Sequence, residues 1–260
     1  LANNRTGPDT ITFSVAGEIM PLSPLPPLID DGTTIDGGNR TVAINGALAG
    51  EANGIEIRSS GNTIRGLVIY NFTTTISTQT GAGIYINGAP LGALPARGDN
   101  NRIYGNWIGL SPAGSAAVSN AGYGIFLANG ASNNIIGADN DADRNVISGN
   151  YAGGIRLMNL NTTGGLLNNN QIVGNYIGTT PNGEGVPAGI TTTRFDAGVA
   201  VGAGSHNTVV SRNVIGGFDT LVADNIGAGI YVTGGDAGSA TSPQNPTGTV
   251  ITGKYIGVSR

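Results

Sequence analysis

Two nine-residue stretches of the sequence are near copies of each other: NRIYGNWIG at 101–109 and NQIVGNYIG at 170–178 share six of nine residues. Each copy contains two short apolar pieces separated by Gly and Asn. A piece this short buries only one or two side chains, so it cannot form a stable element alone. The repetition therefore predicts a stack of similar units that share one core.

A second phrase, G-I-x-I, recurs along the chain and defines the repeat. It occurs as GIEI, GIYI, GIFL, GIRL, GVAV and GIYV at residues 54, 83, 124, 154, 198 and 229, with spacings of 29, 41, 30, 44 and 31 residues. Between these copies lies N-x-I-x-G, at Asn62, Asn101, Asn133 and Asn170, followed by the weaker copies NTVVS at 207 and TVITG at 249. A constant order at such spacings is typical of a solenoid with one turn per unit.

We therefore predict an all-β fold, a right-handed parallel β-helix solenoid of about seven to eight rungs with three short strands per rung. The handedness follows from the general preference for right-handed crossovers. Stacking at about 4.8 Å per rung makes the inward Ile, Val and Leu a continuous core, and stacked Asn amides form ladders. The chain, 1–260, is predicted to be one domain, with an N-terminal lead-in and first rung over 1–53 and regular rungs over 54–260.

The composition is typical of such a fold and argues against several functions. Gly accounts for 45 of 260 residues and charged residues for only 11%, against roughly 7% and 25% in average domains. The net charge of −4 argues against nucleic acid, whose phosphates require clustered Lys and Arg. The sequence has no Cys, which excludes disulfide and thiolate chemistry. It also has no run of 18 apolar residues, so we expect no membrane insertion.

Several longer phrases resemble a known family. GIFLANGASNNIIG at 124–137 and NQIVGNYIGTTPNG at 170–183 are similar to repeats of bacterial cell-surface and secreted parallel β-helix proteins. The opening GPDTITF at 7–13, followed by TTIDG at 33–37, resembles the segment downstream of a CSLREA-type domain. This resemblance implies an extracellular or cell-surface location in bacteria and a longer parent chain. Because an open last rung is an exposed sheet edge, we expect either continuation into a longer solenoid or end-to-end self-association.

The resemblance in fold to β-helix polysaccharide lyases and hydrolases raises the question of catalysis. The outward position of the G-I-x-I strands carries one carboxylate, Glu56, whereas glycoside hydrolysis usually needs two, about 5–10 Å apart. The long inserts at 88–100, 110–122 and 179–197 are expected to wall a groove. If the chain is an enzyme, the candidate catalytic residues are Glu184, Arg194, Asp196 and His206. The alternative is that these are ordinary solvated loop residues.

Aromatic residues give a second candidate site. The aromatic of the repeated phrase falls at Trp107, Tyr176 and Tyr255, on every second rung, so successive rings are expected about 10 Å apart. That interval is close to a disaccharide repeat, so a row of rings is a candidate platform for a polysaccharide. Tyr85 and Phe126, at outward positions of the G-I-x-I strands, are further candidates. The alternative is that the aromatics only cover a hydrophobic corner of the rod.

A third candidate is a metal site. The run ADNDADRN at 138–145 places Asp139, Asp141 and Asp143 at every second position, and alternating oxygen ligands can close on Ca²⁺. The alternative is a solvated acidic turn. From these patterns we predict a non-catalytic extracellular module, serving as a stalk, an adhesin or a glycan-binding surface. The second hypothesis is a polysaccharide lyase or glycoside hydrolase that uses the groove below the inserts.

Overall fold

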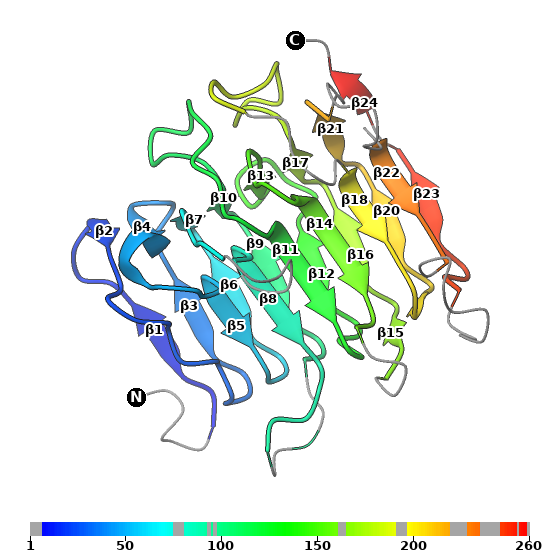
Figure 1. The fold of residues 1–260 in the computed structure, drawn as a ribbon, viewed down its shortest axis with the longest axis horizontal. Coiled ribbons are helices and arrows are strands. Elements are labelled where there is room, and N and C mark those ends of the chain that lie inside the picture. The colour runs from blue at the N-terminus through cyan, green and yellow to red at the C-terminus, as the bar shows by residue number, and fades with distance from the viewer. Residues whose placement is uncertain are drawn as a thin grey trace.

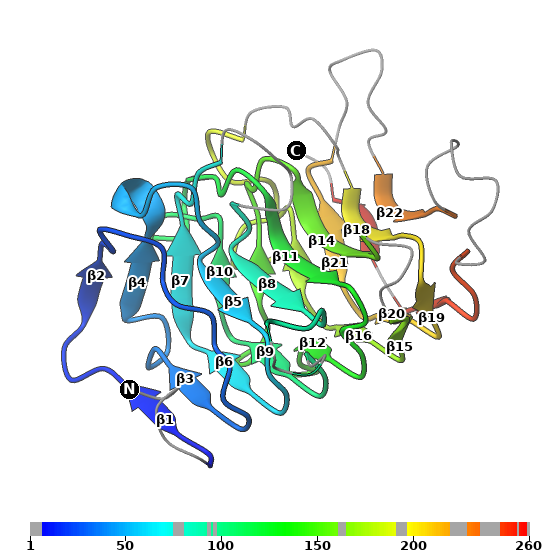
Figure 2. The same ribbon diagram turned by 60° about the horizontal axis from the view of Figure 1, so that its bottom comes forward.

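The computed structural model describes residues 7–74, 81–92, 95, 98–160, 165–190, 197–218, 228–234, 245–253 and 255–258. Within these ranges the chain is a stack of short strands in three parallel sheets, which we name A, B and C (Figures 1 and 2). The helical element is a short 3-10 turn over Gly46–Leu48. No helix in the described ranges is long and apolar enough to cross a membrane.

Sheets A and B each contain eight strands, one from every rung. Sheet A consists of β1 (Thr10–Thr12), β3 (Thr34–Asp36), β6 (Thr63–Arg65), β9 (Arg102–Tyr104), β12 (Ile135–Gly137), β16 (Gln171–Val173), β20 (Val209–Ser211) and β23 (Val250–Thr252). Sheet B consists of β2 (Gly17–Ile19), β4 (Val42–Asn45), β7 (Leu67–Tyr70), β10 (Trp107–Ile108), β13 (Val146–Ile147), β17 (Tyr176–Ile177), β21 (Val214–Gly216) and β24 (Tyr255–Val258).

Sheet C is built from the G-I-x-I phrases and has six strands. They are β5 (Ile55–Ile57), β8 (Ile84–Asn87), β11 (Tyr123–Ala128), β14 (Gly153–Met158), β18 (Ala197–Val201) and β22 (Ala228–Val232). A small pair, β15 (Leu167–Asn168) and β19 (Ser205–His206), follows sheet C and precedes sheet A. The prediction of an all-β parallel solenoid with three strands per rung and about seven to eight rungs is confirmed.

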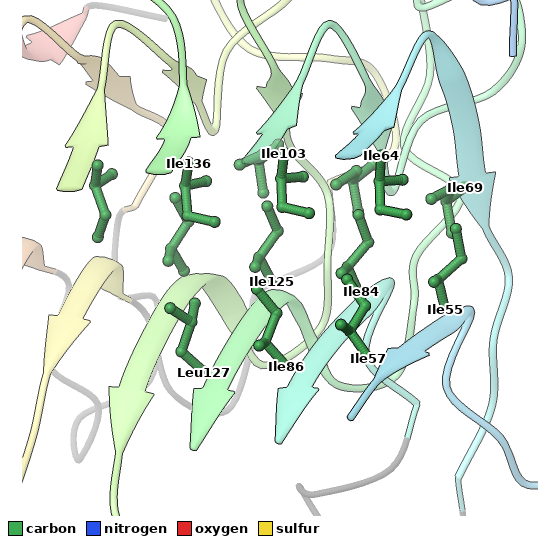
Figure 3. Packing of buried hydrophobic residues seen from close by; sticks show 14 of the residues in the cluster. Ile55, Ile57, Ile64, Ile69, Ile84, Ile86, Ile103, Ile125, Leu127 and Ile136 are labelled. Atoms are coloured by element: carbon green, nitrogen blue, oxygen red, sulfur yellow. The ribbon is translucent and has the colours of Figure 1, made fainter. Parts of the chain in front are cut away.

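The core is a set of aliphatic columns inside the stack. In sheet C the two inward positions of each strand pair with their equivalents in the next rung, as Ile55 does with Ile84 and Ile57 with Ile86. Sheet A contributes Ile64, Ile103 and Ile136, all fully buried (Figure 3). Burying one such side chain contributes roughly 1.5–3 kcal/mol. No single rung holds a core of its own, so each rung is stabilised by its neighbours.

The Gly of G-I-x-I is required by the closeness of the rungs. A Cβ placed on Gly54 would lie 2.4 Å from the carbonyl oxygen of Gly83, and one on Gly154 would lie 2.4 Å from that of Gly198. Contacts below 3 Å with backbone atoms cannot be relieved by side-chain rotation. The phrase is therefore conserved from rung to rung within this chain because its first residue faces the backbone of the following rung.

Buried Asn ladders join the rungs at the corners, as predicted. One ladder runs through the fully buried Asn62, Asn101, Asn134 and Asn170. The Oδ1 atoms of Asn101, Asn134 and Asn170 each accept from the Nδ2 of the Asn in the preceding rung. A second runs through Asn106, Asn145, Asn175 and Asn213. The amides also accept backbone N–H groups that the turns leave without a strand partner, so they satisfy buried polar groups that would otherwise be costly.

The sequence alignment of the repeat was wrong at two positions. Ile136 pairs with Ile103 and Ile172, so Asn134, and not Asn133, is equivalent to Asn101. Asn133 instead has a φ of 57° and is exposed at the turn. The same correction applies to NTVVS, where Thr208 takes the place of the buried Asn. In both cases a turn residue that tolerates left-handed φ precedes the ladder residue. Because the two residues are both polar, the sequence pattern does not show which of them is the buried ladder residue.

Candidate functional site

The candidate catalytic residues that the structure describes lie at different corners of the rod. Glu184 is exposed in the loop between β17 of sheet B and β18 of sheet C, where its Oε2 accepts from Asn182 Nδ2 at 3.3 Å. His206 belongs to β19, between sheets C and A, with Nδ1 2.5 Å from Thr247 Oγ1. Arg194 and Asp196 lie outside the described residues. The structure therefore does not bring Glu184 and His206 together in one groove.

The inserts that were expected to wall a groove gather on two sides. The inserts after β10 and β17 lie side by side, joined by a parallel bridge between Ala116 and Ala188, whereas the insert after β8 lies at the opposite side of the stack (Figure 1). His206 lies in β19 rather than in an insert, and it pairs with Asn168 of β15.

The three Asp of the proposed calcium run have separate partners. Asp139 Oδ1 lies 2.7 Å from Arg212 Nε, and Asp141 Oδ1 lies 2.5 Å from Arg144. Asp143 Oδ2 accepts from Asn140 Nδ2 at 3.0 Å. Among the residues that the structure describes, no group of three or more His, Asp or Glu side chains is placed to hold a metal ion.

Tyr85 and Phe126 form a covered cluster on the outer side of sheet C. Their rings stack with centroids 5.2 Å apart, and Phe126 also meets Tyr123 at 5.8 Å. Only 6% of Tyr85 and 2% of Phe126 is exposed. Burial raises the pKa of the Tyr85 phenol to about 12. Because neither ring presents a face to solvent, we do not include these two residues in a binding surface.

The aromatics of the repeated phrase do stand on alternate rungs. Trp107 is in register with Val146, which is in register with Tyr176, and Val214 separates Tyr176 from Tyr255. Ile108 and Ile177 point into the core, fully buried, so the preceding rings point outward. Trp107 and Tyr176 are half-buried. The side chain of Tyr255 lies outside the described residues.

Each of these two rings is contacted by an Arg and by its own insert. The guanidinium carbon of Arg40 lies 5.3 Å from the Trp107 ring centroid, and that of Arg144 lies 4.4 Å from the Tyr176 centroid. Seven residues after each ring a Gly lies against it: a Cβ on Gly114 would be 2.7 Å from Trp107, and one on Gly183 would be 2.8 Å from Tyr176. The rings therefore hold the inserts in place. This agrees with the alternative that the aromatics have a packing role at the corner of the rod.

A group that the sequence reading missed lies beside Trp107, on the outer side of sheet A. Asp36, Arg65 and Tyr104 occupy the same outward position of β3, β6 and β9. Arg65 donates to Tyr104 Oη at 3.3 Å and pairs with Asp36 at 2.6 Å. The hydrogen bond with Tyr104, followed by the one with Asp36, raises the pKa of Arg65. The guanidinium carbon of Arg102 lies 5.6 Å from the Tyr104 ring centroid.

Arg40 connects this group to Trp107. It donates to the carbonyl oxygen of Gly105, which lies between Tyr104 and Trp107 in the turn from sheet A to sheet B, at 3.2 Å. We call the set Asp36, Arg40, Arg65, Arg102, Tyr104 and Trp107 the arginine–aromatic corner. These six residues carry three Arg and one Asp, 3 − 1 = +2. The turn of the next rung, whose Asp143 carbonyl oxygen accepts from the Gly105 N–H at 2.7 Å, adds Asp139, Asp141, Asp143 and Arg144. The signal was present in the sequence, since NTIRG and NRIYG place Arg65 and Tyr104 at the same position of the repeat.

In comparisons with known proteins, no family model, no curated protein and no solved structure matches this chain. The architecture supports a parallel β-helix, and the assignment to a bacterial surface or secreted family stays a prediction from the repeat phrases.

Proposed function

We propose that this chain is a non-catalytic β-helix module of a bacterial surface or secreted protein, and that it binds a polysaccharide at the arginine–aromatic corner. The observation that carries the proposal is the presence of two aromatic rings and three guanidinium groups on adjacent rungs of one corner. Aromatic faces and edges pack against the apolar side of sugar rings, and guanidinium groups donate in pairs to hydroxyl and carboxylate oxygens.

The exposed guanidinium group of Arg102 points to acidic polysaccharides, such as those that contain uronic acids. A guanidinium group attracts anions at moderate ionic strength, and the attraction decreases with added salt. Arg102 is exposed beside Tyr104, where its guanidinium group can meet a sugar carboxylate. The separation of Glu184 from His206 favours a binding role over the alternative of a lyase or hydrolase.

The test is a binding assay of the purified chain on neutral and acidic polysaccharides, with release of reducing or unsaturated ends followed in the same samples. We expect binding to an acidic polysaccharide without product. Arg102→Ala and Tyr104→Ala are each expected to weaken that binding about tenfold or more, equivalent to about 1.4 kcal/mol.

The matched control is Arg212→Ala, which removes an exposed Arg paired with Asp139 outside the corner. It is expected to bind as the unmodified chain does. Equal losses of affinity for Arg212→Ala and Arg102→Ala would mean that only the net charge of the chain matters for binding. That result would contradict the proposed site. Binding to none of the polysaccharides would overturn the binding role and leave a structural spacer, whereas product release would establish an enzyme.

A further inference from the structure

The outer face of sheet A carries two rows of polar side chains that are in register from β1 to β9. One row consists of Thr10, Thr34, Thr63 and Arg102, and the other consists of Thr12, Asp36, Arg65 and Tyr104. The residues between the two rows, such as Ile64 and Ile103, are fully buried, so both rows point away from the core. We call these two rows the sheet A track. It leads from the arginine–aromatic corner along the axis of the rod, over about 14 Å for three rung spacings.

The Thr hydroxyl groups of the track are free to bind a ligand. Thr10 and Thr12 are exposed, and Thr34 and Thr63 are half-buried. Within the described part of the chain, the hydroxyl groups of Thr34 and Thr63 make no hydrogen bond. A hydroxyl group both donates and accepts, as the hydroxyl groups of sugars do. The row therefore presents one such group about every 4.8 Å, and two rungs are close to the length of a disaccharide.

The rung after β9 does not continue the track. In β12 the half-buried Ile135 takes the position of Arg102, and Gly137, two residues later, has no side chain. The turn that follows β12 carries Asp139, Asp141 and Asp143, and the side chain of Asp141 is 89% exposed. Exposed carboxylates repel an anionic chain. An acidic polysaccharide that is anchored at Arg102 is therefore expected to extend toward β1 and not toward β12.

The unpaired positive charge of the track lies at its β9 end. Arg102 is exposed and forms no ion pair with a carboxylate in the described ranges. Arg65, one rung away, is paired with Asp36 Oδ2 at 2.6 Å, and Asp36 Oδ1 accepts from the Gly38 N–H at 3.0 Å. A ligand carboxylate at β9 therefore meets an unpaired guanidinium group, whereas a ligand carboxylate at β3 meets the carboxylate of Asp36. The track favours an acidic sugar at β9 and disfavours one at β3.

We propose that the polysaccharide lies along the sheet A track, with an acidic sugar at Arg102 and a sugar without a carboxylate over β3. This inference rests on the proposed function and deepens it, because it assigns the direction of the bound chain and the kind of sugar at each end. Thr34 and Thr63 bind sugar hydroxyl groups, and Asp36 determines specificity. The ligand class is a linear polysaccharide whose acidic sugars are separated by several neutral ones, rather than one with a carboxylate on every sugar.

The experiment measures dissociation constants by isothermal titration calorimetry with two sets of oligosaccharides of equal length. Fragments of gellan carry a single uronic acid in each tetrasaccharide repeat, whereas fragments of polygalacturonate carry a uronic acid at every sugar. We expect the unmodified chain to bind the gellan fragments more tightly. Thr34→Val and Thr63→Val should each weaken that binding about two- to tenfold, the range for the loss of one neutral hydrogen bond. The matched control is Thr252→Val, at an exposed position of β23 in the same sheet but beyond the acidic turn, which should bind as the unmodified chain does.

A second variant tests the specificity. Asp36→Asn removes the carboxylate and keeps an oxygen that accepts from the Gly38 N–H. It should strengthen binding of the polygalacturonate fragments about two- to fivefold more than binding of the gellan fragments, in line with the strength of an exposed charge pair. The control is Glu184→Gln, which removes one negative charge from the exposed insert after β17 and should affect both sets of fragments alike.

The outcomes separate this inference from the proposed function. Binding that is lost in Arg102→Ala but unchanged in Thr34→Val and Thr63→Val would overturn the track and leave the proposed site in place. Tighter binding of polygalacturonate by the unmodified chain, or an Asp36→Asn variant with the same preference as the unmodified chain, would overturn the specificity assigned to Asp36. Absence of binding to either set and to the polysaccharides of the first assay would overturn the proposed function and this inference with it.

Discussion

Replacing Asn134 by Ala should destabilise the rod far more than replacing its neighbour Asn133. Asn134 is fully buried, and its Oδ1 accepts from the backbone N–H of Asn101 at 2.9 Å and from Asn101 Nδ2 at 3.0 Å. Its own Nδ2 donates to Asn170 Oδ1 at 3.1 Å. The truncation therefore breaks the ladder between two rungs on either side.

The expected loss can be worked out from the partners that remain. Asn101 Nδ2 keeps its bond to the carbonyl oxygen of Ser59, and Asn170 Oδ1 keeps the backbone N–H of residue 134. The buried N–H of Asn101 has no replacement, which costs about 1–3 kcal/mol, and the lost side-chain bonds add roughly 1 kcal/mol. We therefore expect Asn134→Ala to lower the free energy of unfolding by about 2–4 kcal/mol.

The control removes the adjacent residue, which has the opposite environment. Asn133 is exposed with φ of 57° and accepts one bond from Asn169 Nδ2 at 3.2 Å. Asn133→Ala should cost about 1 kcal/mol from left-handed backbone strain, and Asn133→Gly nearly nothing. Denaturant unfolding followed by circular dichroism and by the fluorescence of the single Trp measures all three variants. Equal losses for Asn134→Ala and Asn133→Ala would refute the assignment of the ladder.

Two further predictions concern aromatic side chains. Gly114 has a φ of 70°, and a Cβ at this position would be directed at the Trp107 ring. We therefore expect Gly114→Ala to displace the insert, to shift the Trp fluorescence emission to longer wavelength and to lower the free energy of unfolding by about 1–2 kcal/mol. An unchanged emission spectrum would contradict the contact. Tyr85 keeps its proton in the folded chain up to a pKa of about 12 but loses it near 10.0 when unfolded. Stability is therefore full below pH 10 and decreases as the pH rises toward 12, and Tyr85→Phe should reduce that decrease in denaturant melts at alkaline pH.

The sequence was sufficient for the architecture because the same physical constraint repeats in every rung. The G-I-x-I phrases mark the strands of sheet C, and alternation along them assigns Ile84 and Ile86 to the core and Tyr85 to the outside. The alternation of Trp107 with Val146 was also predictable, since both precede an Ile that must point inward. These are local consequences of side chains that alternate between two faces.

Burial on the outside of the rod was not predictable in the same way. Tyr85 and Phe126 take outward positions, as expected, yet they are covered, because that depends on which neighbours pack over the sheet. The partners of Asp139 and Asp141 are likewise set by where Arg212 and Arg144 fall in the stack. Such contacts depend on the register between rungs. The misassignment of Asn133 shows that the sequence pattern can give this register wrongly by one residue.

The aromatic of the repeated phrase has a structural reason that needs no ligand. Trp107 and Tyr176 each precede a long insert that returns to contact the ring through Gly114 or Gly183, whereas Val146 precedes only the short connection 148–152 before β14. Loss of binding on replacing Trp107 would therefore report a displaced insert as readily as a lost sugar contact. Tyr104 and Arg102 hold no insert, so variants at these two positions are the ones that separate recognition from architecture.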